Sequence, residues 1–356
     1  MKNIGVIMAG GGGTRFWPLS RVGMPKQVLN ITGGDTMINL TISRCEGLIE
    51  EKDTFIVTNA KQKDVLEKVL KEGVPGENIL LEPHARNTAP CILLAALKLR
   101  SIYGDGVMAV FSSDHYINDE PGFRRVFQTA IDAATERDKL VTIGITPSFP
   151  STGYGYIEYD MGSGQGGVYE VTRFVEKPDR EKAEGYLRSG NYLWNSGMFV
   201  WKISTIISQF ERFLPRIYEQ MLIYAEAMGT ADEDSALREA YESIQSISID
   251  YGIMERSNEV LVIPGDFGWN DVGSWDALAN VFPPDQSGNV VKADYLGIDT
   301  KGCVIYGQDE FVATIGLSDM IVVHTSDALL VCPKDRAHDV KKIVEALRRE
   351  GREDLL

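Results

Sequence analysis

The chain has 356 residues, of which 44% are hydrophobic and 24% are charged, and this composition excludes a disordered or collagen-like protein. Its formal net charge of −15 argues against a general nucleic-acid-binding protein, because a phosphate backbone requires a basic surface. Residues 1–34 differ, since they hold four basic residues, no acidic residue and eight of the 35 glycines. We therefore expect an acidic protein that receives a small anion near its start.

The first half of the chain alternates between strand-like and helix-like segments. Short runs rich in β-branched residues predict strands at 4–9, 54–58, 79–81, 107–112 and 140–145. Apolar residues at helical spacing predict helices at 37–49, 61–72, 88–102 and 123–136. This alternation predicts an α/β, Rossmann-like fold with a mixed, largely parallel sheet and ligands at the carboxyl ends of its strands.

The second half changes character. Residues 153–175 and 192–201 are expected to add strands, and residues 179–189 and 203–245 are expected to be helical. The stretch 282–289 is the best linker candidate, so we expect a catalytic domain at 1–282 and a small β-rich domain at 283–356. Within the latter, short β-rich pieces precede a closing helix at about 335–349; the pieces are 290–292, 303–306, 311–315, 320–324 and 328–331.

The four cysteines are widely spaced and form no CxxC pair, which favours reduced thiols over disulfides or a zinc site. The apolar run at residues 4–9 is too short to span a bilayer, and no cleavage pattern follows it. We therefore expect a cytoplasmic protein without a membrane partner or a nucleic-acid partner.

Four consecutive glycines at residues 10–13 follow the first predicted strand. They do not fit the dinucleotide fingerprint, because neither G-x-G pair has a glycine three positions on, nor the Walker pattern, because the chain has no Gly-Lys dipeptide. A flexible loop whose backbone amides approach a polyphosphate fits better, with Arg15 and Lys26 to balance its charge. The alternative is a structural turn with exposed basic residues.

Residues 9–26, AGGGGTRFWPLSRVGMPK, closely resemble the signature of the sugar-1-phosphate nucleotidyltransferases, and within that family they are similar to the bacterial mannose-1-phosphate guanylyltransferases. Further stretches resemble the family in the same order, so that the likeness covers nearly the whole chain; they are 82–90, 113–115, 152–157, 174–178, 194–198, 248–251, 268–275 and 327–340. The resemblance implies transfer of GMP from GTP to mannose 1-phosphate, giving GDP-mannose and pyrophosphate by in-line attack without a covalent intermediate. Many relatives carry an additional phosphomannose isomerase domain, which we expect this chain to lack.

The resemblance also implies roles for individual residues. Arg15, Lys26 and Lys177 would be the catalytic cations that face the phosphates. Glu82 would accept the N1–H and N2–H₂ donors of guanine, a donor pair that adenine and uracil lack. The implied nucleotide-binding residues are Ala9, Gly10, Gly11, Gly12, Gly13, Thr14, Glu82, Asn87, Thr88 and Ser113.

Asp114 and Asp271 are implied to hold Mg²⁺ or another divalent cation, for which carboxylates and phosphate oxygens are suitable ligands. Their separation in the sequence does not itself support a metal site, and on residue type alone each would be a helix cap or an ion-pair partner. The implied sugar-binding residues are Gly155, Glu176, Asn195 and Gly197.

Two other functions stay open on the sequence. One is a nucleotidyltransferase for another sugar, using dTTP or UTP with glucose 1-phosphate, and the other is a non-catalytic regulatory paralogue that binds sugar nucleotide. The resemblance further implies that the C-terminal β pieces form a left-handed β-helix-like coil. Residues 290–331 are a possible homodimer surface.

Overall fold

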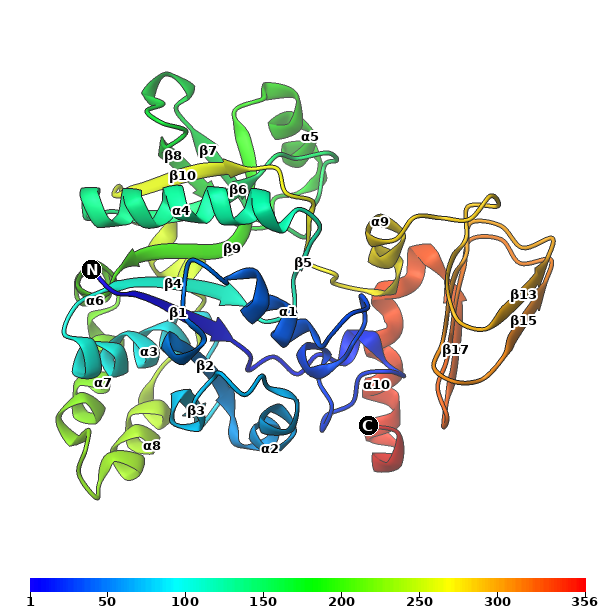
Figure 1. Ribbon diagram of the computed structural model, residues 1–356, viewed down its shortest axis with the longest axis horizontal. Coiled ribbons are helices and arrows are strands. Elements are labelled where there is room, and N and C mark those ends of the chain that lie inside the picture. Colours follow the sequence, from blue (N-terminus) through cyan, green and yellow to red (C-terminus); the bar gives the residue numbers. More distant parts are fainter. The chain divides into compact units, whose positions relative to one another are not determined.

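A computed structural model describes residues 1–356 (Figure 1). The chain forms two compact units, and neither is continuous in sequence. The first unit comprises residues 1–10, 41–113 and 117–269, and the second comprises residues 11–40, 114–116 and 270–356. Helix α1 (Met37–Arg44) and the two-residue strands β5 (Tyr116–Ile117) and β11 (Trp269–Asn270) lie where the chain passes from one unit to the other.

The first unit is built on a nine-stranded sheet in the order β3-β2-β1-β4-β9-β6-β10-β8-β7 (Figure 1). Strands β1 to β4 pair in parallel, as do β6 and β10, whereas β7, β8 and β9 pair antiparallel to their neighbours. The strands are β1 Asn3–Met8, β2 Thr54–Asn59, β3 Ile79–Glu82, β4 Val107–Ser112, β6 Leu140–Ile145, β7 Tyr156–Tyr159, β8 Tyr169–Val175, β9 Tyr192–Lys202 and β10 Val260–Gly265. The mixed α/β sheet predicted from the sequence is confirmed.

Successive strand residues point to opposite faces of this sheet. Helices pack against the apolar side chains on both faces. Ile4 and Val6 of β1 belong to a buried cluster that also contains residues of α3, α6, α7 and α8. On the other face, Phe111 of β4 packs on the rings of Phe123 and Phe127 from α4. The helices are α2 Ala60–Val69, α3 Thr88–Tyr103, α4 Glu120–Arg137, α5 Arg180–Ser189, α6 Ile203–Phe213, α7 Pro215–Ala227 and α8 Glu233–Ser243.

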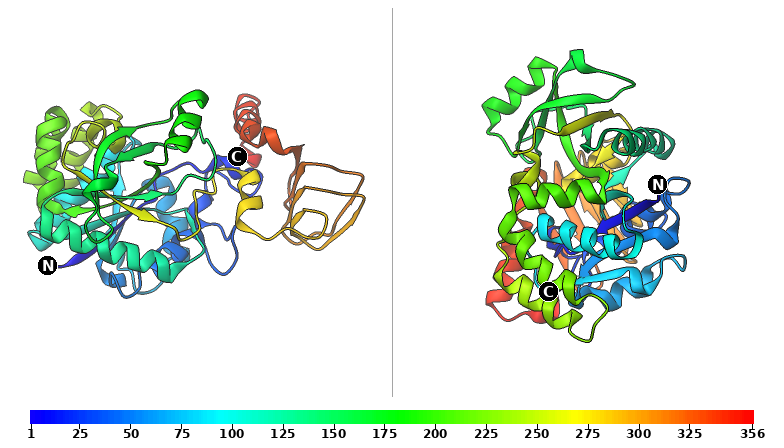
Figure 2. Two further views of the ribbon diagram at one scale, coloured as in Figure 1. Left: turned by 90° about the horizontal axis from the view of Figure 1, so that it is seen from above. Right: turned by 90° about the vertical axis from the view of Figure 1, so that its left-hand side faces the viewer.

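The second unit combines the segment after β1 with the end of the chain. Strands β12, β14 and β16 stack in parallel and β13 pairs in parallel with β15, so the chain coils as in a β-helix (Figure 2, left). Strand β17 closes this stack antiparallel to β16. The elements are α9 Leu278–Val281, β12 Val290–Lys292, β13 Tyr295–Ile298, β14 Val304–Gly307, β15 Val312–Ile315, β16 Met320–His324, β17 Leu329–Pro333 and α10 Val340–Arg349.

Two expected helices differ from the structure, and two strands of more than two residues were not expected. The helix predicted at 37–49 ends at Arg44, because Gly47 has a φ of 85° and the chain turns there. The helical stretch predicted at 203–245 is three separate helices, with Pro215 opening the second and Gly229 lying between the second and third. Strands β10 and β13 lie at residues for which no strand was predicted, and in β13 the three consecutive residues Leu296, Gly297 and Ile298 are exposed.

Candidate active site

The glycine-rich loop after β1 leaves several backbone amides without an acceptor. Gly11 and Gly12 are exposed, and a side chain on either would point into open space. The N–H groups of Gly12, Gly13 and Thr14 form no hydrogen bond within the chain. The loop therefore presents consecutive amide donors to solvent, which is the arrangement that binds an anion.

Gly13 joins this loop to the segment that carries Lys26. Its φ of 53° lies in the left-handed region, which glycine adopts without strain. A Cβ atom at this position would lie only 2.6 Å from the backbone nitrogen of Lys26. Glycine is therefore required both by the backbone conformation and by this close approach.

Lys26 fixes the two aspartates that were expected to bind metal. The residue is only 4% exposed. Its Nζ donates to the backbone oxygen of Asp114 at 2.8 Å, to Oδ2 of Asp114 at 3.0 Å and to the backbone oxygen of Asp271 at 2.8 Å. An ammonium has three N–H donors, so all of them are used within the protein. Lys26 therefore has no N–H donor left for a ligand, and its hydrogen bonds hold Asp114 and Asp271 together.

The loop, Lys26 and both aspartates line one cavity of about 390 Å³ within the second unit, and Arg15 and His115 are also among its lining residues. Burial acts to raise the pKa of Asp114, but Lys26, His115 and Arg15 outweigh it and hold that pKa below its usual value. Asp114 is therefore an ionised carboxylate at neutral pH, as a ligand for a hard cation must be.

The backbone beside Asp271 is strained. Val272 has a φ of 45°, a conformation that a β-branched residue rarely adopts and that costs about 1–3 kcal/mol. The side chain of Asn270 stabilises it by accepting the Val272 N–H at 2.7 Å. This strained turn sets the direction of the Asp271 carbonyl that Lys26 binds.

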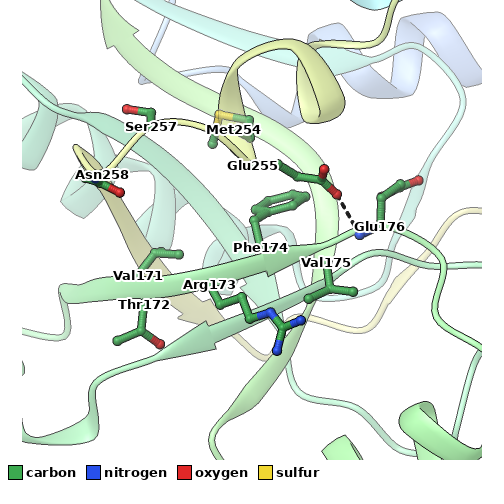
Figure 3. A pocket seen from close by; sticks show the side chains of 10 residues that line it. All are labelled: Val171, Thr172, Arg173, Phe174, Val175, Glu176, Met254, Glu255, Ser257 and Asn258. Carbon is green, nitrogen blue, oxygen red and sulfur yellow. Dashed lines mark hydrogen bonds between the residues drawn. The ribbon is translucent and has the colours of Figure 1, made fainter.

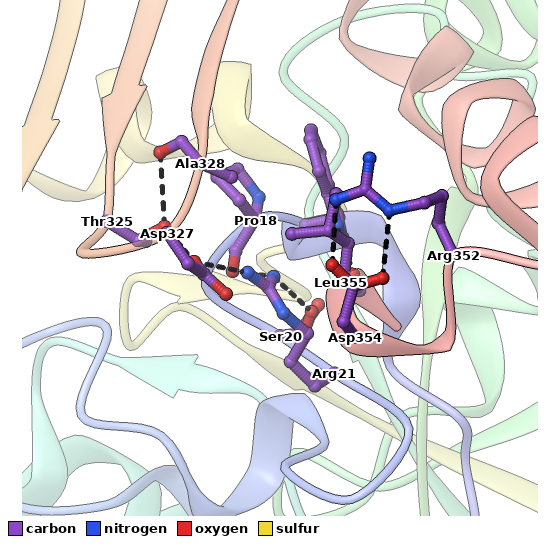
Figure 4. Close-up of polar contacts among 10 residues, drawn as sticks. Pro18, Ser20, Arg21, Thr325, Asp327, Ala328, Arg352, Asp354 and Leu355 are labelled. Carbon is purple, nitrogen blue, oxygen red and sulfur yellow. Dashed lines mark hydrogen bonds and ion pairs between the residues drawn. The ribbon is translucent and has the colours of Figure 1, made fainter.

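Arg21 anchors the segment that connects Arg15 with Lys26. Its Nη2 donates to Oδ1 of Asp327 at 2.8 Å, and its guanidinium also donates to the carbonyl of Pro18 (Figure 4). Thr325 donates to the same carboxylate oxygen at 2.9 Å. The loop before β17 therefore braces the signature segment.

The final residues brace the same segment. The indole Nε1 of Trp17 donates to the carbonyl of Leu355 at 2.8 Å, and the backbone N–H of Val22 donates to the carbonyl of Leu356 at 3.0 Å. The side chain of Leu356 is buried in the same apolar cluster as Trp17. Residues 17–22 are thus held by the C-terminal tail.

In the first unit, Glu82 ends β3 and is buried, with only 7% of the residue exposed. The hydroxyl of Tyr241 donates to its Oε1 at 3.2 Å. Burial raises the pKa of Glu82 to about 7, although the Tyr241 hydrogen bond acts in the opposite direction. Its Oε2 faces Gly10, where an added Cβ would lie 3.2 Å away. The structure therefore brings Glu82 and Gly10 together.

The other expected nucleotide-binding residues have partners of their own. Asn87 caps α3 with a φ of 70°, and its Oδ1 accepts the N–H of Thr88. The Thr88 hydroxyl accepts the N–H of Ile249 at 2.8 Å. Ala9 is tied into the sheet by its N–H and its carbonyl, and the buried Ser113 donates its N–H to the carbonyl of Met8.

The expected sugar-binding residues lie together in the first unit. Asn195 donates its backbone N–H to the carbonyl of Gly155 at 2.8 Å, and its side-chain Oδ1 accepts the N–H of Gly197 at 3.0 Å. A Cβ on Gly155 would collide with Oε2 of Glu176 and would lie 3.3 Å from Cβ of Asn195. The absence of a side chain at Gly155 therefore leaves space beside the side chains of Glu176 and Asn195.

Lys177 follows Glu176 with a φ of 45°, another left-handed conformation at a residue other than glycine. Its Nζ lies 3.1 Å from Oε1 of Glu176, and its side chain is 61% exposed against 10% for that of Glu176. The turn therefore presents an exposed ammonium beside a buried carboxylate.

The comparison with protein families identifies the chain. The sequence model of the family described as nucleotidyl transferase matches residues 4–288, which is most of the chain. The chain belongs to this family. A second model, described as a MannoseP isomerase/GMP-like beta-helix domain, matches residues 293–347 and confirms the predicted β-helix-like end.

Individual proteins are similar to this chain over nearly its whole length. A mannose-1-phosphate guanylyltransferase of Escherichia coli K12 is 40% identical over 98% of this chain and 74% of its own length. The xanthan biosynthesis protein XanB of Xanthomonas campestris is also 40% identical, with the same coverage. A crystal structure from Thermus thermophilus, described as a mannose-1-phosphate geranyltransferase, is 36% identical with a TM-score of 0.89 and covers 98% of this chain and 100% of that one.

The donor set of this nucleotidyl transferase suits Mg²⁺. No group of three or more histidine, cysteine, aspartate or glutamate side chains is placed to hold a metal ion. The cavity of the second unit instead offers two carboxylates, from Asp114 and Asp271, beside a loop with donors for phosphate. Mg²⁺ is commonly bound by one or two carboxylates with substrate phosphates and waters, so these residues fit that ion.

Sequence reasoning missed two residues that contact the expected site residues. Tyr241 orients Glu82, and the Asp250 carboxyl accepts a hydrogen bond from Asn195. Asp250 lies in the stretch 248–251 that resembles the family, which was the available signal, whereas nothing in the sequence marks Tyr241. None of the helices has both the length and the apolar character needed to cross a membrane.

Proposed function

We propose that this nucleotidyl transferase moves GMP from GTP to mannose 1-phosphate and releases pyrophosphate and GDP-mannose. Membership of the family and the 40%-identical guanylyltransferase support the choice of reaction and substrates. The structural observation that carries it is the loop with three unpaired amides beside two aspartates that Lys26 holds together.

In the proposed reaction, the sugar phosphate oxygen attacks the α-phosphorus of GTP in line, and no residue of the chain becomes covalently attached. The amides of Gly12, Gly13 and Thr14 would bind the β- and γ-phosphates, and Arg15 would stabilise the negative charge of the departing pyrophosphate. Asp114 and Asp271 would hold Mg²⁺, which supplies positive charge against the triphosphate. Lys26 keeps these two residues in place and adds one buried positive charge.

Substrate choice would come from residues of the first unit. The Glu82 carboxylate would accept the two N–H donors of guanine, with Tyr241 fixing its orientation. Glu176 would accept hydrogen bonds from sugar hydroxyls, and the exposed ammonium of Lys177 would bind the sugar phosphate. Asn195 and the backbone at Gly155 and Gly197 would complete the sugar pocket.

The reaction is tested by measuring pyrophosphate release from each nucleoside triphosphate with mannose 1-phosphate and with glucose 1-phosphate, with and without Mg²⁺. We expect turnover with GTP and mannose 1-phosphate that depends on Mg²⁺. Preferred use of dTTP or UTP with glucose 1-phosphate would refute the substrate assignment, and binding of GDP-mannose without any turnover would indicate a regulatory paralogue.

Three further predictions accompany this function. We predict a domain boundary at residues 282–283, which limited proteolysis would test. We also predict a cytoplasmic location, which cell fractionation would test. A homodimer is the third prediction, and light scattering would test it.

A further inference from the structure

A short segment after α8 runs from the loop that carries the proposed base-binding residues to the proposed sugar pocket. Ile247 donates its N–H to the carbonyl of Arg86 at 3.2 Å and accepts the N–H of Ala89 at 3.1 Å. Ile249 donates its N–H to the Thr88 hydroxyl at 2.8 Å. The next residue, Asp250, begins a π-helical turn that ends at Met254. Such turns occur often at functional sites.

The Asp250 carboxyl is fixed against the sugar pocket. Its Oδ1 accepts the Nδ2–H of Asn195 at 2.9 Å, while Oδ1 of Asn195 accepts the Gly197 N–H at 3.0 Å. The Asn195 side chain is thus held at both of its polar atoms. Oδ2 of Asp250 has no partner from another side chain and remains available as an acceptor.

The other end of the same turn holds Glu176. Glu255 directly follows the turn, and its Oε1 accepts the backbone N–H of Glu176 at 3.1 Å (Figure 3). Glu255 and Glu176 also line a cavity of about 370 Å³ together with β8. The turn therefore contacts Asn195 through Asp250 and positions Glu176 through Glu255.

The charges in this pocket favour a ligand with hydroxyl donors. Burial, followed by repulsion from Glu176, raises the pKa of Asp250 to about 6, whereas Asn195 and Lys177 act to lower it. The ammonium of Lys177 is paired with Glu176 rather than with Asp250. A carboxylate with one fixed oxygen and no cation of its own is stabilised when a hydroxyl donates to the other oxygen.

We propose that Asp250 is a second hydroxyl acceptor of the sugar pocket, beside Glu176, and that it contributes to selection of the sugar. This inference rests on the proposed function and adds to it a residue that directly contacts the substrate. It differs from a purely structural role, in which Asp250 would only orient the amide of Asn195.

Asp250→Asn distinguishes the two roles, because an amide oxygen can still accept from Asn195 while the amide NH₂ replaces the proposed acceptor. We expect this variant to bind GDP-mannose about 10- to 100-fold more weakly than the wild type, with GDP affinity unchanged, when measured by calorimetry with Mg²⁺. The KM for mannose 1-phosphate should rise with the KM for GTP unchanged. Asp232→Asn, which removes an exposed carboxylate near α8, is the matched control.

Deoxy analogues of mannose 1-phosphate then identify the hydroxyl, because the analogue that lacks it should bind the wild type and Asp250→Asn equally. If Asp250→Asn does not fold by circular dichroism, Asp250→Ser is measured in the same way. Unchanged GDP-mannose affinity in a folded variant would overturn the inference. A wild type that binds GDP-mannose no better than GDP and shows no turnover would instead overturn the proposed function.

Discussion

If Glu82 accepts the guanine donors as proposed, GTP binding should depend on pH near neutrality. Its pKa is raised to about 7 by burial, and only the carboxylate can accept both guanine donors. One pH unit below that value about one carboxyl group in ten is ionised, so the KM for GTP should rise about tenfold for each unit of acidification. Above about pH 8 the KM should be constant, because the carboxyl group is then almost fully ionised.

Initial rates at saturating mannose 1-phosphate, measured from about two units below to one unit above this pKa, test the expectation. Glu82→Gln carries no titrating group and should have a high KM for GTP with a flatter pH profile. Ionisation of GTP itself affects both proteins equally, so a difference between their pH profiles of the KM for GTP is caused by ionisation of Glu82. Tyr241→Phe should move the midpoint upward, because the Tyr241 hydroxyl stabilises the carboxylate. Identical pH profiles for the wild type and Glu82→Gln would refute the reasoning.

The same carboxyl group should affect folding stability. Its pKa in the folded chain, about 7, lies above the ordinary value of 4.5, so the folded state binds this proton more tightly than the unfolded state. The contribution of Glu82 to the free energy of unfolding therefore rises as the pH falls from about 7 toward 4.5, by on the order of 3 kcal/mol. Urea unfolding of the wild type and Glu82→Gln across this range measures it, and an equal pH dependence in both proteins would contradict the assignment.

Three further substitutions test the proposed site. Lys26→Met should lower the free energy of unfolding by about 2–3 kcal/mol, because it breaks a buried ion pair whose other side chain, that of Asp114, is 35% exposed. The same substitution should raise the Mg²⁺ concentration needed for activity. Urea unfolding and a Mg²⁺ titration measure these two effects, and unchanged values in both would be inconsistent with the proposed role of Lys26. Gly155→Ala should displace Glu176 and raise the KM for mannose 1-phosphate about tenfold or more while leaving the KM for GTP unaltered, and equal changes in both constants would argue against a sugar pocket here. Arg15→Gln should lower kcat about 100- to 1,000-fold with the fold retained by circular dichroism, and a kcat near that of the wild type would remove Arg15 from the catalytic groups.

Local signals predicted the strands and helices well because each depends on neighbouring residues. The β-branched run before the glycines, for example, became β1, and the loop after it has the open backbone that four glycines suggest. Helix ends were predicted less well, because the expected helices 37–49 and 203–245 were continued through Gly47, Pro215 and Gly229, which are residues that commonly end or begin a helix.

The partners of the site residues could not be predicted, because they come from distant parts of the chain. The sequence indicated that Lys26 would reach the phosphates, but it did not show that all three Nζ donors would bind the backbone and side chain of Asp114 and the backbone of Asp271. Likewise, Tyr241 comes to Glu82 from 159 residues away, on a helix with no motif of its own.

The contacts between the signature segment and the C-terminal tail have a consequence for synthesis of the protein. Trp17 and Leu355 are 338 positions apart, and Val22 binds the carbonyl of Leu356. These bonds form only after residue 356 has left the ribosome, and closing so long a loop is entropically slow compared with forming local structure. The segment between Arg15 and Lys26 therefore reaches its native hydrogen bonding only after residues 355 and 356 have been synthesised, long after its own translation.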